Sequence, residues 1–344
     1  MKIKLLVVFT TLFFTALQGQ NFNSPIEYLK YVNKEQEMVT KSMWKYTKTV
    51  AHSKSGKRIE TTRKSLIKSI QQAQANIIKL KNGYNGDTDY NEKIINYLAI
   101  SENIISEDYA KIVDMQEIAE QSYDQMEAYL MMKEKVNERM STEQENLNLA
   151  FKTFAAKYNI NLSEEQSELG KKMKISDEVF KYYDQFYLIF FKCNITESNL
   201  LKAITANDKA AIQQYTSALE SFSNEGLEKI ALLQPFKKDK SLLDTTIKSM
   251  QFYKKVATEF GPASLDFMIA SEKFENVKNT LEKKSQKDRT NEEIDYYNLQ
   301  VKEINSKVNT FNNLGNKFNQ ERSKTVDSWN TIGSDFISRH VPVD

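Results

Sequence analysis

The sequence predicts an all-α protein with two related up-down helical bundles, of about four helices each, and a long C-terminal helix. Helix-breaking residues are scarce, since the 344 residues include only 9 Gly and 4 Pro. Apolar residues recur at intervals of three and four through most of the chain, which is the spacing of one helical face. Both observations favour long helices over β-sandwiches or α/β folds.

The first bundle is expected within residues 20–160. At the start of its first helix, Ser24 is a suitable cap, Pro25 suits the first helical position and Glu27 completes a capping box. The second helix is marked by a stripe of apolar and small residues: Ile59, Leu66, Ile70, Ala73, Ile77 and Leu80. Gly83 predicts its end, because Gly adopts the left-handed conformation without strain.

The rest of the first bundle is predicted to be helical as well. The stretch from Ile94 to Leu130 contains no Gly or Pro, and a break is expected near 106–108. Thr142 and Glu145 form another capping box, which predicts a separate helix that ends near Tyr158.

The second bundle is expected at residues 177–344, after a linker at residues 161–176. Pro235 predicts the end of its second helix, and Gly261 with Pro262 predicts a break or kink in its third.

The last helix is the strongest helical signal in the chain. Thr290 and Glu293 form a capping box at its start. A heptad pattern then continues for about forty residues, with an interruption at Arg322 and Thr325. This pattern predicts a helix of roughly 70 Å.

The two bundles match in register. One shift along the chain places Ile59 on Ile212, and it also places the small residue Ala73 on the small residue Gly226. The same shift aligns the following helices and the loops between them, which chance similarity between amphipathic helices does not easily produce. We therefore expect an internal duplication.

The N-terminus has the pattern of an export signal. Lys2 and Lys4 precede an apolar run from Leu5 to Leu17, which is typical of a secretory signal peptide, here residues 1–19. The run is shorter than the roughly 20 apolar residues of an ordinary membrane span. We expect a periplasmic, outer-surface or secreted protein without a lipid anchor, because no Cys lies at the expected cleavage site. An uncleaved N-terminal anchor is the alternative.

Charge argues against two classes of partner. The chain holds 48 Lys and Arg against 46 Asp and Glu, and loss of Lys2 and Lys4 with the signal would leave these numbers equal. Nucleic-acid binding requires a basic surface, so no nucleic acid is expected. Electrostatic attachment to anionic lipid is not expected either. No segment after the signal is apolar for long enough to span a membrane.

Residues that commonly perform catalysis are sparse. His52 and His340 are the only His residues, and neither has a ligand-like neighbour at helical spacing, so no zinc or di-iron site is indicated. Cys193 lies within an apolar stripe and is interpreted as a buried thiol. Helix capping explains the paired carboxylates, which are Glu143, Glu145, Glu292 and Glu293. We expect no catalytic residue, cofactor or metal.

An aromatic run in the first helix of the second bundle is the densest local feature. One helical face cannot hold all of these rings, so they are either buried on most sides or exposed to a partner. The candidate partner-contact residues come from this helix and from the last helix: Tyr183, Phe186, Tyr187, Phe318 and Trp329.

The chain resembles the uncharacterised exported helical surface or envelope proteins of bacteria with two membranes. The resemblance is based on the signal at Lys2 to Gly19, the Ser24-Pro25-Ile26-Glu27 start and the repeat. It implies duplicated bundles without catalytic residues. Members are often lipoproteins, but this chain lacks the Cys that a lipid anchor requires.

We therefore expect an exported, non-catalytic envelope or surface protein that is a binding or structural module for a protein or a glycan. A helical pore-forming or membrane-interacting protein is the first alternative. A hydrolase that uses paired carboxylates is the second. Helix-mediated oligomerisation is a further option for the long helices.

Overall fold

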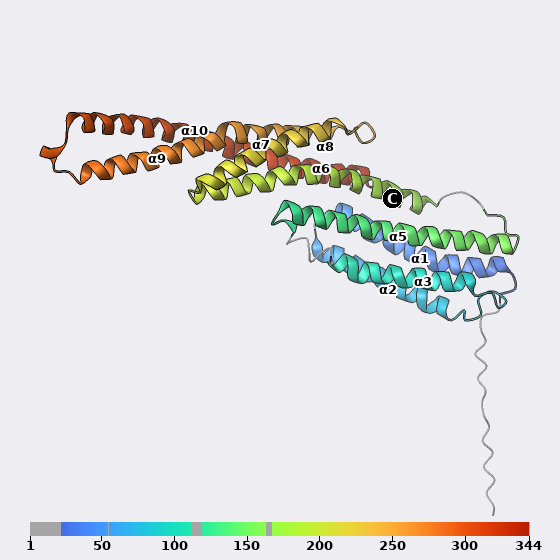
Figure 1. Cartoon of the computed structure of the whole chain (residues 1–344). Coiled ribbons are helices and arrows are strands. Elements are labelled where there is room, and N and C mark those ends of the chain that lie inside the picture. The colour runs from blue at the N-terminus through green and yellow to red at the C-terminus, as the bar shows by residue number, and fades with distance from the viewer. Residues whose placement is uncertain (1–21, 54, 112–118, 163–166, 344) are drawn as a thin grey trace, which may run out of the picture. The chain divides into compact units, whose positions relative to one another are not determined.

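The computed structural model describes residues 22–53, 55–111, 119–162 and 167–343 (Figure 1). These residues are all-α, and the β-type pairing among them is limited to two isolated bridges, Tyr84 with Asp87 and Phe236 with Asp239. The predicted fold class is therefore confirmed, and the predicted up-down bundles are compatible with it. The signal peptide predicted at residues 1–19 lies outside the described residues.

The elements follow one another along the chain as nine α-helices, two π-helical turns (η1 and η2) and one 3-10 turn (η3) within the described residues. The first elements are α1 (Pro25–His52), α2 (Gly56–Ile78), α3 (Asp89–Asn103), η1 (Ile104–Asp108) and α5 (Tyr123–Lys157). The later elements are α6 (Glu168–Thr205), α7 (Lys209–Ala231), α8 (Ser241–Lys255), η2 (Val256–Phe260), α9 (Gly261–Glu282), η3 (Gln286–Asp288) and α10 (Asn291–His340).

The chain divides into two compact units. The first comprises the described residues up to Lys45, together with Glu60–Glu107 and Asn137–Glu165. The second comprises Tyr46–Ile59, Asp108–Val136 and the residues from Gln166 onward. Each unit is described by itself below.

Helix starts depend on local capping. Thr290 and Glu293 form the predicted capping box, with Glu293 N–H donating to Thr290 Oγ1 at 3.3 Å and Thr290 N–H donating to the Glu293 carboxylate at 3.1 Å. Ser167 caps α6 by accepting from Gly170 N–H at 3.1 Å, so this helix begins inside the segment predicted as a linker. The helix start predicted at Thr142 is wrong, because α5 continues through it. Thr142 is exposed, and a polar residue on the solvent side of a helix does not end it.

The break predicted near 106–108 overlaps the π-helical turn η1, and the break predicted at Gly261 and Pro262 lies directly after η2. A π-helical turn accommodates one extra residue and widens the helix locally. After η2, Gly261 lies so close to α7 that a Cβ on it would be 2.4 Å from Thr216 Oγ1. Gly is therefore required by packing at this position.

The predicted apolar stripes form the cores. In the first unit, the α2 positions Leu66, Ile70, Ala73 and Ile77 are buried, and so is Leu80 just after this helix. The core of the second unit takes residues from α6, α7, α8, η2 and α10, among them Val179, Leu200, Ile212, Leu219, Leu242 and Val256. None of the described helices combines the length and the apolar character that a membrane crossing requires.

The two units have helices of matching length. Both α2 and α7 have 23 residues, both α3 and α8 have 15, and each of the latter pair is followed by a five-residue π-helical turn. These matches are consistent with a duplication, which stays a prediction at this point.

The loop between α2 and α3 holds the end of α5. Asp87 Oδ2 accepts hydrogen bonds from Lys157 Nζ at 2.7 Å and from the Tyr158 hydroxyl at 2.9 Å. The Tyr158 ring lies edge-on to the Tyr84 ring at 5.1 Å. Gly86 allows the tight turn, because its φ of 86° is a left-handed conformation.

The loop between α7 and α8 holds the end of α10 in the same way. Asp239 Oδ2 accepts from Arg339 Nη1 at 2.6 Å and lies 2.8 Å from His340 Nε2. The His340 ring lies edge-on to the Phe236 ring at 5.1 Å. We call each of these arrangements a loop-aspartate clasp.

The second unit contains a longer connection between its clasp residues. Asp239 and His340 are 101 residues apart, whereas Asp87 and Tyr158 are 71 apart. The longer connection contains α9 and the first part of α10, which run side by side as a hairpin (Figure 1). No residue between Ala270 and Gln300 is fully buried.

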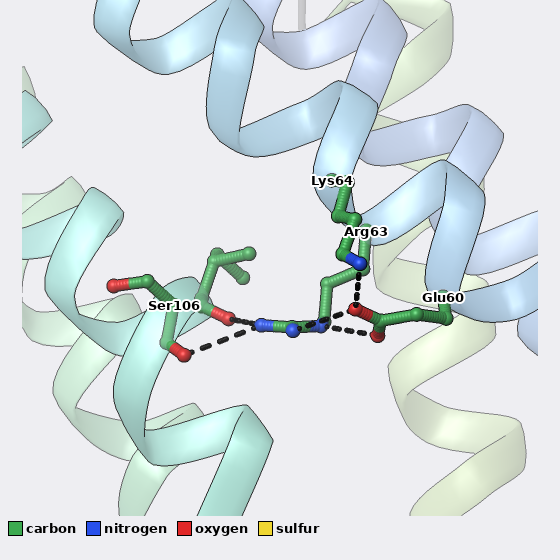
Figure 2. Close-up of polar contacts among 5 residues, drawn as sticks. Glu60, Arg63, Lys64 and Ser106 are labelled. Atoms are coloured by element: carbon green, nitrogen blue, oxygen red, sulfur yellow. Dashed lines mark hydrogen bonds and ion pairs between the residues drawn. The ribbon is translucent and has the colours of Figure 1, made fainter.

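Arg63 of α2 binds the π-helical turn η1 of the first unit. Figure 2 shows its guanidinium between the carboxylate of Glu60 and the carbonyl oxygens of the turn. Nε and Nη2 donate to Glu60 at 2.8 and 2.9 Å, while Nη1 donates to the carbonyl oxygens of Ile105 at 2.8 Å and Ser106 at 3.3 Å. Arg63 thus connects the side chain of Glu60 in α2 to two carbonyl oxygens of the π-helical turn.

We expect Arg63→Met to lower the free energy of unfolding by about 1.5–3 kcal/mol, the range for hydrogen bonds from a charged group. Urea denaturation measures this loss. Lys64→Met is the matched control, because Lys64 is exposed and lies 3.5 Å from the same Glu60 carboxylate. The control should change stability by less than about 0.5 kcal/mol. Equal losses in both variants would contradict the assignment.

Candidate functional site

The five predicted partner-contact residues lie in or against the core of the second unit. Phe186, Phe318 and Trp329 are at most 1% exposed, and Tyr183 and Tyr187 are partly buried against the same core. Of the two interpretations that the sequence left open, burial is therefore the one that explains the first three, since a fully buried ring offers no surface to a partner.

Trp329 is at the centre of this aromatic packing. Its ring stacks on Phe190 at a centroid distance of 4.3 Å and an interplanar angle of 10°, and its Nε1 donates to Thr246 Oγ1 at 3.2 Å. The Tyr183 and Tyr187 rings lie 5.7 and 5.6 Å from it. Burial raises the pKa of the Tyr187 hydroxyl to about 12 and also raises the pKa of Tyr183. Both hydroxyls are therefore neutral at ordinary pH.

Arg322 interrupts the apolar stripe of α10 because it pairs with a buried carboxylate. Its Nε donates to Glu197 Oε1 at 2.9 Å, and Glu197 is only 2% exposed. Burial raises the pKa of Glu197 to about 7, against the opposing effect of Arg322. Glu197 is closed to solvent, whereas Arg322 is partly exposed.

The His and Cys residues that the sequence singled out make contacts within the described part of the chain. The described residues contain no group of three His, Cys, Asp or Glu that is placed to hold a metal. Cys193 is buried, and burial raises its thiol pKa to about 12, so the reactive thiolate is suppressed. His52 Nδ1 lies 3.3 Å from Ser338 Oγ, and His340 belongs to a clasp.

The best candidate for a ligand site is a groove of about 670 Å³ in the first unit, between α3 and α5. We call it the α3–α5 groove. Its volume lies within the roughly 300–1,000 Å³ that is typical of ligand pockets. Lining residues from α3 are Tyr90, Glu92, Lys93, Asn96 and Tyr97, and those from α5 include Glu143, Asn146, Leu147, Ala150, Thr153 and Phe154.

Polar contacts connect α3 or its preceding loop to α5 at two positions along the groove. The Tyr97 hydroxyl donates to Gln144 Oε1 at 2.7 Å. At the other position, the clasp joins Asp87 to Lys157 at 2.7 Å. The groove between these contacts is therefore held by side chains that connect its two walls.

The floor of the groove is aromatic and apolar, whereas its rim is polar. Tyr90, Leu147 and Phe154 are buried beneath it. Asn96 and Asn146 are exposed, and each provides an amide that both donates and accepts hydrogen bonds.

Acidic groups exceed free cations in the groove. Asp89, Glu92 and Glu143 line it together with Lys93, while Lys157 is already paired with Asp87. This balance disfavours an anionic ligand and suits a neutral or cationic one.

The corresponding place in the second unit is filled. When Lys157 and Arg339 of the two clasps are aligned, Leu147 corresponds to Trp329 and Ala150 to Ile332. Trp329 reaches from α10 to Thr246 of α8, the helix that corresponds to α3. In this alignment, the larger side chain of Trp329 takes the position that Leu147 has at the α3–α5 groove.

No family model, curated protein or solved structure matches the chain. The site has to be judged from its own residues alone.

Sequence reasoning missed this groove. Its residues belong to two helices that are separated by tens of residues, and each looks like an ordinary surface or core position in its own helix. A weak signal was present in α5, where small Ala150 and Thr153 follow Leu147 in a helix that is otherwise expected to pack against its neighbours.

The buried pair predicts a specific pH dependence of stability. Between the ordinary carboxyl pKa of 4.5 and about 7, folded Glu197 retains a proton that the unfolded chain releases. The free energy of unfolding therefore falls as the pH rises through this interval. We expect Glu197→Gln to remove this fall, as measured by urea denaturation at a series of pH values.

Glu228→Gln is the matched control, because Glu228 is exposed and carries the same functional group. Its stability should follow the wild type across the interval. If the Glu197→Gln and wild-type curves run parallel from pH 4.5 to 7, the shifted ionisation of Glu197 is refuted.

Proposed function

We propose that this protein is an exported, non-catalytic binding module of the cell envelope or surface, and that its ligand is a glycan. The observation that carries the proposal is the α3–α5 groove, which combines an aromatic floor with a polar rim. A protein partner is the alternative ligand class.

The chemistry of the groove suits a polyhydroxylated ligand. Sugar hydroxyls both donate and accept hydrogen bonds, and the rim offers amides at Asn96 and Asn146 and carboxylate acceptors at Asp89, Glu92 and Glu143. Tyr97, which is partly buried, and Leu149, which is 66% exposed, line the groove and offer apolar surface to the faces of sugar rings. The contacts between the two walls also hold the groove in place before a ligand binds, so little conformational entropy is lost on binding.

The proposal includes an internal duplication as the origin of the two units. The equal lengths of α2 and α7 and of α3 and α8 support it. The two clasps support it more specifically, because each joins a loop aspartate to a cation and a ring at the end of the unit's last helix. In this view the first unit kept or gained an open groove, while Trp329 closed the corresponding place in the second.

Export is supported by the N-terminal sequence. We expect the protein in the periplasm, on the cell surface or in the medium, with cleavage near Gly19. Cell fractionation followed by N-terminal sequencing of the isolated protein measures both. Recovery in the cytoplasm with Met1 intact would contradict export.

The role of the α3–α5 groove is tested by replacing the small Ala150 with Ile, the residue at the aligned position 332 of the second unit. We expect Ala150→Ile to abolish or weaken glycan binding at least tenfold, a change of about 1.4 kcal/mol. A glycan array identifies the best oligosaccharide, and isothermal titration with that compound measures the change. Ala156→Ile is the matched control, because Ala156 is an exposed alanine of the same helix and does not line the groove.

A second pair of variants tests the polar rim. Asn146→Ala should weaken binding by about fivefold to tenfold, as loss of ligand hydrogen bonds predicts. Asn148→Ala, an exposed residue on the same helix outside the groove lining, should leave it unchanged. Equal effects in both members of either pair, or no oligosaccharide bound by the wild type, would refute the glycan proposal.

A further inference from the structure

A second groove lies in the second unit, mainly between α6 and α7. It has a volume of about 340 Å³, and most of its lining is apolar. We call it the α6–α7 groove. Its apolar lining includes Leu188 and Ile189 of α6, Phe222 of α7, and Leu232 and Leu233 just after α7.

A lysine is held within this apolar groove. Lys192 Nζ lies 4.1 Å from the centre of the Phe222 ring and 4.8 Å from the centre of the Tyr123 ring. It also pairs with Glu225 at 2.8 Å. Two ring faces and one carboxylate thus fix a cation where the surroundings are otherwise apolar.

The charged residues that line the groove are Lys192, Lys229 and Glu225, which together carry a net charge of one positive unit. Glu225 pairs with both Lys192 at 2.8 Å and Lys229 at 2.6 Å. Hydrogen bonds from these two ammonium groups lower the pKa of Glu225, so it is ionised at neutral pH. Lys229 is 55% exposed, so its remaining N–H donors are open to a ligand.

The rim of the groove exposes an unusually large apolar side chain. Leu232 is 82% exposed, the highest value among the large apolar residues in the described part of the chain. An isolated exposed leucine needs no explanation, but this one continues the apolar lining of a concave surface.

Corresponding positions in the first unit are polar. The shift that places Ala73 on Gly226 places Ser69 on Phe222, Gln72 on Glu225 and Asn76 on Lys229. The combination of an aromatic ring, a carboxylate and a lysine is therefore a feature of the second unit and not a requirement of the bundle.

We propose that the α6–α7 groove binds a small amphipathic anion, namely a single-chain carboxylate of the fatty-acid class. The apolar lining accommodates the chain, and Lys192 and Lys229 neutralise the carboxylate at the rim. The excess positive charge of the α6–α7 groove would repel a cationic amphiphile. The acidic residues of the α3–α5 groove would repel an anionic one, so the two grooves select different ligands. This site is independent of the proposed glycan groove.

The test is a calorimetric titration of the full chain with dodecanoate, at concentrations below those at which dodecanoate forms micelles. We expect saturable binding with one site. Lys229→Gln should weaken it about fivefold to tenfold, as loss of one charge-assisted contact predicts. Leu232→Asp should weaken it at least as much, because it places a negative charge at the apolar rim.

Matched controls separate this site from general surface effects. Lys181→Gln removes a similarly exposed α6 lysine that pairs with Asp177, and Ile269→Asp changes an exposed apolar residue of α9; both should bind normally. Circular dichroism of each variant confirms folding. Ala150→Ile should also bind dodecanoate normally, which keeps the outcome distinct from that of the glycan proposal.

Three ligand comparisons decide the chemistry. Dodecanol should bind about tenfold more weakly than dodecanoate, as loss of the charged contact predicts. Dodecyltrimethylammonium and acetate should not bind measurably. Equal binding of dodecanol, equal losses in the control variants, or binding only to phosphatidylglycerol vesicles would each overturn the proposal.

Discussion

The loop aspartates Asp87 and Asp239 hold the end of the last helix in each unit. Each carboxylate accepts hydrogen bonds from a cation and contacts a ring group at the helix end, while its own loop is fixed by left-handed residues. A helix held at one end has its remaining side chains assigned to faces by the helical period. The position of Leu147 in the floor of the α3–α5 groove, and of Trp329 in the aligned position of α10, is consistent with the helix ends that the clasps hold.

Differences between the units then arise from side chains on a shared framework. Small residues of α5 leave a polar and aromatic groove open in the first unit, while Trp329 and Ile332 occupy the equivalent positions of α10. On the α6–α7 side the roles are reversed, because Phe222 and Lys192 build an apolar, cationic groove in the second unit where the first has polar residues. Function on such bundles is determined by local substitutions and not by the fold.

Helical periodicity and capping were sufficient to predict the fold class and much of the core from the sequence. The stripe from Leu66 to Leu80 is buried, and the capping box at Thr290 forms. The continuity of α5 through Thr142 was missed, because a capping sequence on the solvent face is compatible with a helix interior. Contacts between distant residues were also inaccessible. Arg322 and Glu197 lie 125 residues apart, and neither groove belongs to one segment. A single aromatic stripe likewise does not reveal which helices will cover it.

The hairpin of α9 and α10 has a consequence for how the second unit moves. The two helices pack against each other, and none of the residues between Ala270 and Gln300 is fully buried. The free energy needed to open a segment locally rises with the apolar contact that the segment buries. Protection of backbone amides from hydrogen exchange is therefore expected to decrease from the bundle toward η3. The outer turns can fray and reform without loosening the aromatic core around Trp329. The outer part of the hairpin is therefore expected to exchange its amide hydrogens before the core of the second unit does.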